Sequence, residues 1–213
     1  MHSSIRLLEH LGVWTENLRQ HCAPLKQLHL LDDTGNLVQA PDLRFSSEEA
    51  QLEAFGWNTP LNNLLPALRK RAEELGVRFV EDVVASVEQI GNGLTFITQG
   101  GQIIESEFAV AADGRNSLLR KAADIAVSEW SFEQSALVTR FSHSRSHECV
   151  STEWHKLGGP FTTVPLPGNT SALVWMDKPD KIAALMQLDA KALARDIQLM
   201  NHGTLGLISN VQK

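Results

Sequence analysis

FAVAADGRNSLLR, residues 108–120, is the stretch of sequence that decides the predicted fold. Its first five residues are apolar or small, as in strands that are covered on both faces of a sheet. Asp113-Gly114 is a turn sequence, because an Asp carboxylate accepts hydrogen bonds from nearby backbone N–H groups and Gly tolerates a positive φ. Asn116 or Ser117 can then cap a helix. The stretch predicts a buried strand, a sharp turn and the start of a helix.

A strand that leads into a helix N-terminus is a frequent place for phosphate binding in α/β proteins, because unpaired N–H groups and the helix dipole attract anions. Arg115 and Arg120 add positive charge, and a guanidinium group offers paired donors to a phosphate. The residues alone leave two interpretations open. The stretch is either a nucleotide-phosphate site or a plain strand-to-helix turn.

The pattern of an apolar strand followed by Asp-Gly-x-x-Ser-x-x-Arg resembles the Asp-Gly motif of the class A FAD-dependent monooxygenases, the p-hydroxybenzoate hydroxylase-like enzymes. Asp113, Gly114, Ser117 and Arg120 fill its fixed positions without a mismatch. The resemblance implies that these four residues are cofactor-binding and help to place FAD and its NAD(P)H reductant. It implies no catalytic residue, because the cofactor carries the oxygen chemistry and the protein supplies a dry, oriented pocket.

Other stretches resemble the ubiquinone-biosynthesis branch of that family. Residues 3–14 are similar to the helix after the first flavin loop, residues 130–138 to the strand after the Asp-Gly helix, and residues 159–175 to paired strands of the substrate sheet. The resemblance implies an aromatic-ring hydroxylase that uses FAD, NAD(P)H and O₂. It also implies a polyprenylated phenol as substrate.

Two flavin-binding segments of that family have no counterpart in the sequence. There is no G-x-G-x-x-G loop, and Gly91-Asn92-Gly93 is better interpreted as a hairpin turn. The Gly-Asp motif that holds the flavin ribose is also missing, so the chain resembles the central part of such an enzyme. We expect weak or no FAD binding and no activity from it alone. The alternative is a non-catalytic module that binds a quinone-like lipid or another protein.

Composition limits the other function classes. The 213 residues are 43% hydrophobic, and the formal net charge of −6 argues against a nucleic-acid partner. No apolar run is long enough for a membrane span. Cys22 and Cys149 are isolated thiols, as expected in a reducing compartment. The isolated thiols predict a cytoplasmic protein. The family resemblance implies peripheral contact with the inner membrane or with a ubiquinone-biosynthesis complex at most.

The periodicity of apolar residues predicts an α+β fold with a mostly antiparallel sheet. We expect helices over residues 5–13, 60–75, 115–123, 178–188 and 190–201. We expect strands over residues 28–31, 37–40, 51–58, 77–80, 83–90, 94–98, 103–112, 130–141, 149–155, 162–165 and 171–176. The resemblance divides the chain into an inner flavin domain, residues 1–24 and 59–125, and a substrate sheet with following helices, residues 25–58 and 126–213.

Two residue sets have competing interpretations. His143, His147, Cys149 and His155 suggest a metal site, but the spacing lacks a tetrahedral set, so solvated loop histidines and no metal ligand are expected. Four tryptophans lie in strand-like segments, where core packing is favoured over an apolar wall for an aromatic, prenylated substrate. They are Trp57, Trp130, Trp154 and Trp175.

Overall fold

The fold is described from a computed structural model that covers residues 2–91 and 93–212. The chain divides by its contacts into two compact units, Met1–Leu75 with Phe132–Lys213, and Gly76–Ser131. Both units combine helices with antiparallel strands, which confirms the predicted α+β class. The predicted grouping of residues 1–24 with 59–125 stays a prediction.

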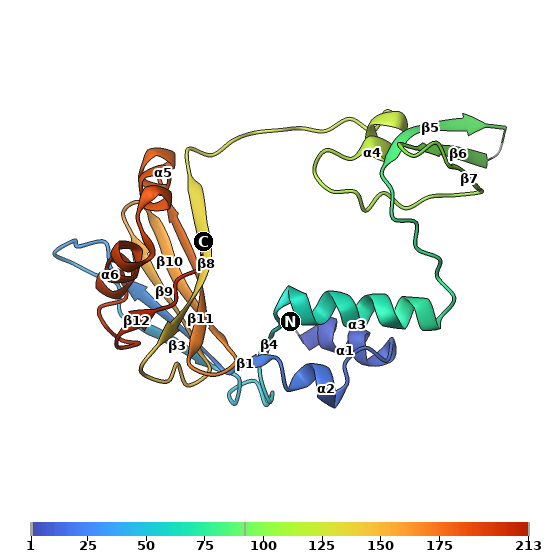
Figure 1. The fold of residues 1–213 in the computed structure, drawn as a ribbon. Helices are drawn as coiled ribbons and strands as arrows, with labels where there is room; N and C mark the ends of the chain where they lie inside the picture. Colours follow the sequence, from blue (N-terminus) through green and yellow to red (C-terminus); the bar gives the residue numbers. More distant parts are fainter. Residues whose placement is uncertain (1, 92, 213) are drawn as a thin grey trace. The chain divides into compact units, whose positions relative to one another are not determined.

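The first unit is built on a seven-stranded sheet (Figure 1). Its strand order is β12 (Ile208–Ser209), β8 (Ser135–His143), β11 (Thr170–Asp177), β10 (Gly159–Leu166), β9 (Val150–Lys156), β2 (Gln27–Asp32) and β3 (Leu43–Ser46). All neighbours run antiparallel except β2 and β9, which are parallel. The parallel pairing of β2 with β9 therefore joins residues that lie more than a hundred positions apart in the sequence.

Helices α5 (Pro179–Gln187) and α6 (Ala190–Met200) cover one face of this sheet. Odd-numbered side chains of β10 and β11 point toward these helices, as the alternating burial of both strands shows. Phe161 and Leu173 are fully buried there, together with Leu193 and Ile197 of α6. Alternation along the strands thus builds one core between sheet and helices.

The opposite face of the sheet is also apolar. Even-numbered side chains such as Val164 and Val174 are only partly buried, and Val138, which pairs with Val174, is 68% exposed. Leu28 and Leu30 of β2 lie on the same face, but the intervening strand β9 places the polar residues Ser151 and Glu153 beside them. We call the following six residues the open sheet face: Leu28, Leu30, Val138, Val164, Val174 and Met176.

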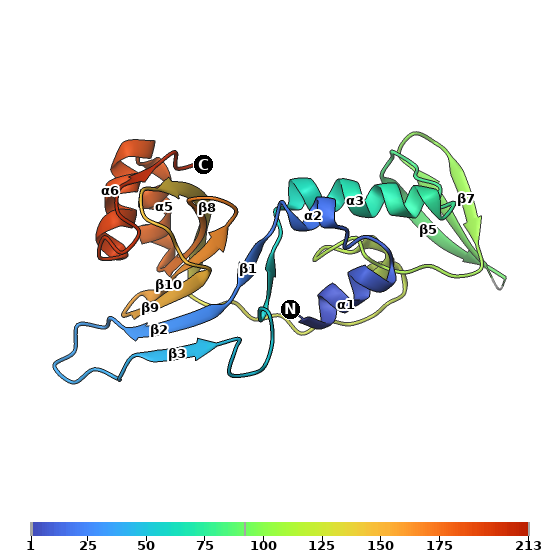
Figure 2. The ribbon, with the colours of Figure 1, turned by 90° about the horizontal axis from the view of Figure 1, so that it is seen from below.

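A small helical layer belongs to the same unit. It contains α1 (His2–His10), α2 (Glu16–Arg19), α3 (Leu61–Glu74) and the short pair of β1 (Ala23–Leu25) with β4 (Gly56–Asn58) (Figure 2). Val13, Leu18 and Cys22 are buried in its centre. Gly76 ends the long helix with a φ of 84°, as predicted from its position.

The Gly76–Ser131 unit holds a three-stranded antiparallel sheet and one short helix. The strands are β5 (Val84–Ile90), β6 (Gly93–Thr98) and β7 (Ile103–Ser106), and the helix is α4 (Leu118–Ala122). The strands β5 and β6 pair as a hairpin, in agreement with the turn predicted at Gly91-Asn92-Gly93, although Asn92 itself lies outside the described residues.

Several predicted strands are wrong or shortened. The partner of β2 is formed by residues 43–46 and not by 37–40, because Asp32 holds the intervening loop in a closed turn. Only residues 56–58 of the stretch 51–58 are extended, and residues 77–80 form no strand. Most important, the strand predicted over 103–112 ends at Ser106.

Candidate functional site

The Asp-Gly turn has a closed hydrogen-bond network. The Asp113 carboxylate accepts from the backbone N–H of Leu118 at 2.7 Å and from that of Leu119 at 3.5 Å. The Ser117 hydroxyl, buried in the turn, caps α4 by accepting from the N–H of Arg120 at 3.0 Å. Gly114 has a φ of 86°, the left-handed conformation that explains a glycine at this position. The local geometry matches the turn and cap predicted from the sequence.

The charge of Asp113 is stabilised within this turn. A hydrogen bond from the Ser117 hydroxyl, and then the backbone N–H groups of Leu118 and Leu119, hold the pKa of the Asp113 carboxyl below its ordinary value. Asp113 is therefore an anion that fixes the turn at neutral pH. Its side chain is engaged in the turn itself, so its contribution to a ligand is to shape the backbone around Gly114.

No backbone N–H at the start of α4 is free for a phosphate. Those of Leu118, Leu119 and Arg120 bind side chains, and the N–H of Ser117 donates to the Gly114 carbonyl. These N–H groups already have partners within the chain, and a phosphate site at this helix start stays a prediction. The guanidinium of Arg120 donates to the Arg115 carbonyl at 2.8 Å, which ties both arginines to the same turn.

The segment before the turn is neither a strand nor buried. Phe108 is 76% exposed and Val110 is 78% exposed. The prediction of a buried strand is wrong here because no strand among the described residues pairs with residues 108–112. Apolar composition favours a buried strand only when another strand satisfies the backbone N–H and C=O groups.

A hollow of about 730 Å³ lies beside the turn, within the Gly76–Ser131 unit. Val87 and Leu94 line one wall, and residues 109–111 line another. Gly114, Ser117 and Arg120 lie at its polar side, so the structure brings three of the four predicted site residues to one cavity. Its volume falls in the range of small-molecule and cofactor sites, roughly 300–1,000 Å³.

These residues fit part of a flavin dinucleotide. The apolar walls suit a flat aromatic ring, and Arg120 with the backbone at Gly114 offers polar contacts beside it. The pyrophosphate of the dinucleotide is not matched, because neither the sequence nor the turn supplies a glycine-rich loop with free N–H groups for it. The cofactor-binding role of Asp113, Gly114, Ser117 and Arg120 stays a prediction.

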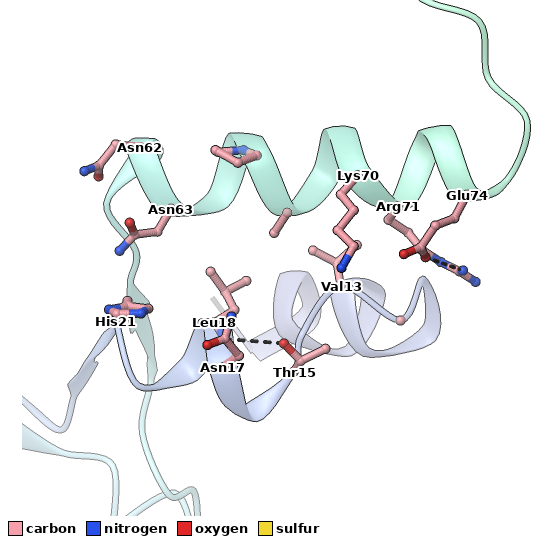
Figure 3. Close-up of a pocket in the computed structure, with 13 residues that line it drawn as sticks. Val13, Thr15, Asn17, Leu18, His21, Asn62, Asn63, Lys70, Arg71 and Glu74 are labelled. Carbon is pink, nitrogen blue, oxygen red and sulfur yellow. Dashed lines mark hydrogen bonds and ion pairs between the residues drawn. The ribbon is translucent and has the colours of Figure 1, made fainter.

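A second hollow, of about 430 Å³, lies between α3 and the α1–α2 segment (Figure 3). Asn17, His21 and Asn63 line it at one end, and Lys70 and Arg71 line it at the other. Arg71 is engaged by the Leu11 carbonyl at 2.7 Å and by Glu74 at 3.2 Å. Its walls are open and mostly polar, in contrast to the hollow at the Asp-Gly turn.

The positions of the four tryptophans decide between core packing and exposure on the surface. Trp154 and Trp175 are each 2% exposed and pack on Phe161 under α5 and α6, and Trp57 packs edge-on against Trp14. Trp130 is 74% exposed and lies outside any strand. Core packing is therefore confirmed for three of the four. The even-numbered apolar residues Val164, Val174 and Met176 lie on the opposite, open sheet face, and their signal in the sequence is the alternation in residues 164–166 and 172–176.

The histidine cluster is structural. His143 is 5% exposed on β8, so the expectation of a solvated loop histidine is wrong for this residue. Its Nδ1 donates to the Arg145 carbonyl at 2.6 Å, and its Nε2 accepts from the Ser171 hydroxyl at 3.0 Å. Burial lowers the pKa of His143, and the nearby His147 lowers it further. Within the described part of the chain, no group of three His, Cys, Asp or Glu side chains is arranged to hold a metal.

The comparisons with known proteins agree on one family. The model described as "FAD binding domain" matches residues 2–182. A ubiquinone hydroxylase, UbiL, of Rhodospirillum rubrum is 27% identical over 208 residues, covering 97% of this chain and 47% of that protein. The 3-demethoxyubiquinol 3-hydroxylase of Escherichia coli is 26% identical, covering 97% of this chain and 52% of that protein.

Solved structures support the fold. The Pseudomonas aeruginosa protein PqsL superimposes with a TM-score of 0.72 at 19% identity, over 98% of this chain and 60% of that one. The chain spans about half the length of the curated relatives it matches. In the residues described, no helix combines the length and the apolar character that crossing a membrane requires.

Proposed function

This chain belongs to the FAD-binding domain family, and from that premise we propose that it forms the central part of an FAD-dependent aromatic-ring hydroxylase of ubiquinone biosynthesis. The observation that carries the proposal is the hollow beside Gly114, Ser117 and Arg120, at the motif that first indicated a flavin enzyme. The ubiquinone-hydroxylase names of the first relatives support the choice of pathway.

In the proposed reaction NAD(P)H would be the reductant, and FAD, when bound, would supply the chemistry that transfers one oxygen atom of O₂ to a phenol ring and releases the other as water. The residues of this chain bind and orient. Asp113 and Ser117 fix the backbone at Gly114, and Arg120 supplies a positive charge at the edge of the hollow. Val87 and Leu94 exclude water from its apolar wall.

The proposed substrate is a polyprenylated phenol that lies on the open sheet face. This face offers six partly buried or exposed apolar side chains on the side of the sheet away from α5 and α6. Four come from the neighbouring strands β8, β11 and β10, and two come from β2, which β9 separates from β10. An apolar surface of this kind suits a prenyl chain, whose transfer from water is favourable by roughly 25 cal/mol for each Å² buried. Peripheral contact with a membrane, or with other enzymes of the pathway, follows as the expected way to reach such a substrate.

An FAD titration tests the cofactor half of the proposal. We expect the 213-residue chain to bind FAD weakly or not at all, because it offers no pyrophosphate cradle. Flavin fluorescence is followed while protein is added, and any residual binding should fall with Arg120→Gln but not with Arg78→Gln, an exposed arginine of the same unit. A stoichiometric yellow protein would contradict the expected weakness.

A second candidate function is a binding module without flavin chemistry. It is favoured by the large sheet, which carries its own core and its own apolar face. Titration of a prenylated phenol separates the two functions: binding without FAD supports the module, and binding only with FAD supports the enzyme. Val138→Gln on the open sheet face should weaken binding about fivefold. Leu207→Gln, at a residue that is 70% exposed elsewhere on the same unit, should not.

A further inference from the structure

The loop between β2 and β3, residues 33–42, presents the most exposed apolar side chains of the large-sheet unit. Leu37 is 103% exposed relative to its reference state, and its neighbour Val38 is 85% exposed. Figure 2 shows the loop reaching beyond the ends of both strands. The exposure of two adjacent apolar side chains to water is unfavourable, so other contacts must hold the tip in this conformation.

The base of the loop is closed by one carboxylate. Asp32 Oδ1 accepts from the Thr34 backbone N–H at 3.1 Å and from the Thr34 hydroxyl at 2.7 Å. Asp32 Oδ2 accepts from the Ala40 N–H at 2.8 Å. The backbone N–H of Ala40 and that of Thr34 lie six residues apart, so this bridge turns the chain back on itself and leaves residues 35–39 as a projecting tip.

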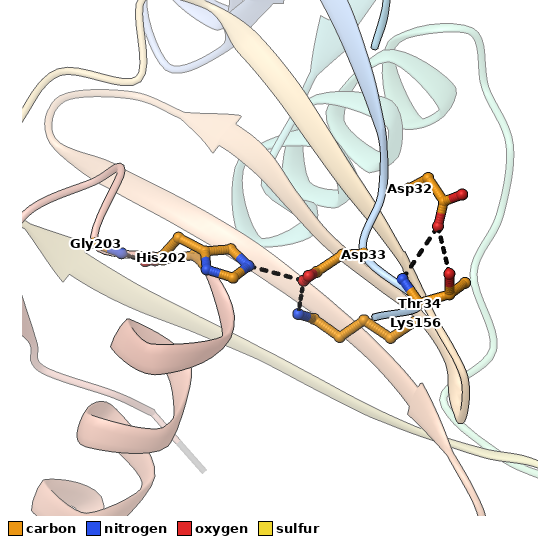
Figure 4. Close-up of polar contacts among 7 residues, drawn as sticks. Asp32, Asp33, Thr34, Lys156, His202 and Gly203 are labelled. Carbon is orange, nitrogen blue, oxygen red and sulfur yellow. Dashed lines mark hydrogen bonds and ion pairs between the residues drawn. The ribbon is translucent and has the colours of Figure 1, made fainter. Parts of the chain in front are cut away.

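The neighbouring acidic groups also have partners. Asp33 binds Lys156 of β9 and accepts from His202 Nε2 at 2.8 Å (Figure 4). Burial acts to raise the pKa of Asp33, but the hydrogen bonds from Lys156 and His202 outweigh it and the pKa is lowered. Asp42 lies 3.4 Å from His29 Nε2. Residues 34–41 contain no charged side chain at all.

A third exposed apolar residue lies at the same end of the sheet. The backbone N–H of Asp33 donates to the His155 carbonyl, which places the loop beside the end of β9. Leu157, in the turn that follows β9, is 83% exposed. One end of the sheet therefore carries an uncharged tip with an exposed leucine in the adjacent turn.

We propose that this loop is a membrane-contact element, which inserts Leu37 and Val38 into the interface of a lipid bilayer. An uncharged tip can leave water without desolvating an ion, and the net charge of −6 gives no reason for attraction to anionic lipid. The partner is therefore a neutral, zwitterionic lipid surface, bound through apolar contact. The inference rests on the membrane contact of the proposed function and names the loop that makes it, while its test needs neither flavin nor phenol.

A lipid surface fits this tip better than a protein surface. A stable protein interface buries roughly 800 Å² on each partner, with a central apolar patch. Two side chains at a loop tip cannot supply that area, whereas a bilayer accepts single side chains and gains from each one. The binding expected from so small an insertion is weak and reversible.

Co-sedimentation with phosphatidylcholine vesicles tests the proposal, with the full chain and without flavin or phenol. We expect the protein to partition onto vesicles and the double variant L37N/V38N to lower the partition coefficient about tenfold or more. L207N is the matched control, because Leu207 is 70% exposed and lies beside His143, at the opposite end of the sheet. Its partition coefficient should stay within about twofold, and salt should have little effect on any of the three proteins.

A fluorescence reporter in the loop distinguishes loss of lipid contact from unfolding of the protein. L37W places a reporter at the tip, and its fluorescence should shift to the blue and be quenched by brominated phosphatidylcholine. Failure of the unmodified chain to bind vesicles, or equal binding by L37N/V38N, would overturn the proposal. So would self-association in the absence of lipid that the double variant abolishes, since the tip would then contact a second copy of the chain.

Discussion

The large sheet and the segment around the Asp-Gly motif have similar apolar sequences but opposite burial. In the sheet, Phe161 and Leu173 are 0% exposed beneath α5 and α6. In the Gly76–Ser131 unit, Phe108 and Val110 are more than three-quarters exposed, although they precede the motif that best identifies the family. In the large sheet, neighbouring strands and two helices bury the side chains of the core face, whereas no described strand pairs with residues 108–112.

The difference shows that a buried strand needs backbone hydrogen bonds from a neighbouring strand and a helix or second layer that covers its side chains. Strands β8, β11, β10 and β9 lie side by side in that order as antiparallel neighbours, and the next two helices of the chain cover one face of them. Residues 108–112 have no paired strand among the described residues. The Phe108 carbonyl accepts from the Ser106 hydroxyl at 2.9 Å, but no neighbouring strand satisfies the backbone groups of this segment. Residues 108–112, which lie beside the predicted cofactor site, therefore need a further paired strand to form a buried strand themselves.

Replacing Phe161 by Ala should have the largest effect on stability. The ring is fully buried and packs edge-on between Trp154 and Trp175, with ring centroids 5.6 and 5.2 Å away. Loss of a buried Phe costs about 3–5 kcal/mol of unfolding free energy. Urea unfolding followed by tryptophan fluorescence and circular dichroism measures it.

Phe108→Ala is the matched control for this comparison. Its ring is 76% exposed, so the unfolding free energy should change by about 0.5 kcal/mol or less. If the two substitutions were equally destabilising, residues 108–112 would be buried in solution and the contrast between the regions would be lost.

Two glycines with positive φ sharpen the comparison. An alanine at position 159 would bring its Cβ to 2.8 Å from the Met176 carbonyl oxygen, whereas a Cβ at Gly114 meets nothing within 4 Å. Gly159→Ala should therefore cost about 3 kcal/mol, from strain and overpacking together, and Gly114→Ala about 1 kcal/mol from strain alone. Chemical denaturation of the first, and hydrogen exchange of α4 in the second, give the two values. Similar costs would mean that the Asp-Gly turn is as tightly packed as the sheet.

His143 makes the stability of the large sheet depend on pH. Burial holds its pKa below the ordinary value of 6.5, so the unfolded state binds a proton more readily than the folded state. Stability should be fully present above pH 6.5 and fall as the pH drops below it. Urea midpoints at pH 7.5 and 5.5 test this, and His143→Gln should reduce the difference between them. An unchanged difference would assign the pH dependence to other groups.

The sequence was enough to predict the sheet because its information is local. The strands predicted over residues 162–165 and 171–176 agree with β10 and β11, and the helices predicted over 178–188 and 190–201 agree with α5 and α6. The β2–β3 pairing was misplaced because the side chain of Asp32 reaches Ala40, eight residues away, and moves the second strand to residues 43–46. Such a bridge has no periodic signal.

The site was predictable only in its local part. The Asp113 turn, the Ser117 cap and the left-handed Gly114 follow from residue chemistry and are present. The environment of the motif does not follow, because the burial of Val110 depends on a partner strand that no residue of the motif encodes. The open sheet face was not predicted from the sequence. The large aromatic residues Trp154 and Trp175 lie on the core face, and the smaller apolar residues at alternate positions form the open face.

Removal of the two helix caps should have the smallest effect and tests whether the regions unfold separately. Asp189 accepts from the Ala192 N–H at 2.8 Å at the start of α6, and Ser117 accepts from the Arg120 N–H at 3.0 Å at the start of α4. Each replacement by Ala should cost about 1 kcal/mol.

Asp189→Ala should lower the unfolding free energy of the large sheet, because Leu193 and Ile197 of the same helix are fully buried in its core. Ser117→Ala should speed hydrogen exchange in residues 118–122 and leave the sheet unchanged, since the Gly76–Ser131 unit has few buried apolar side chains. An equal loss of sheet stability in both variants would show that the two regions unfold as one.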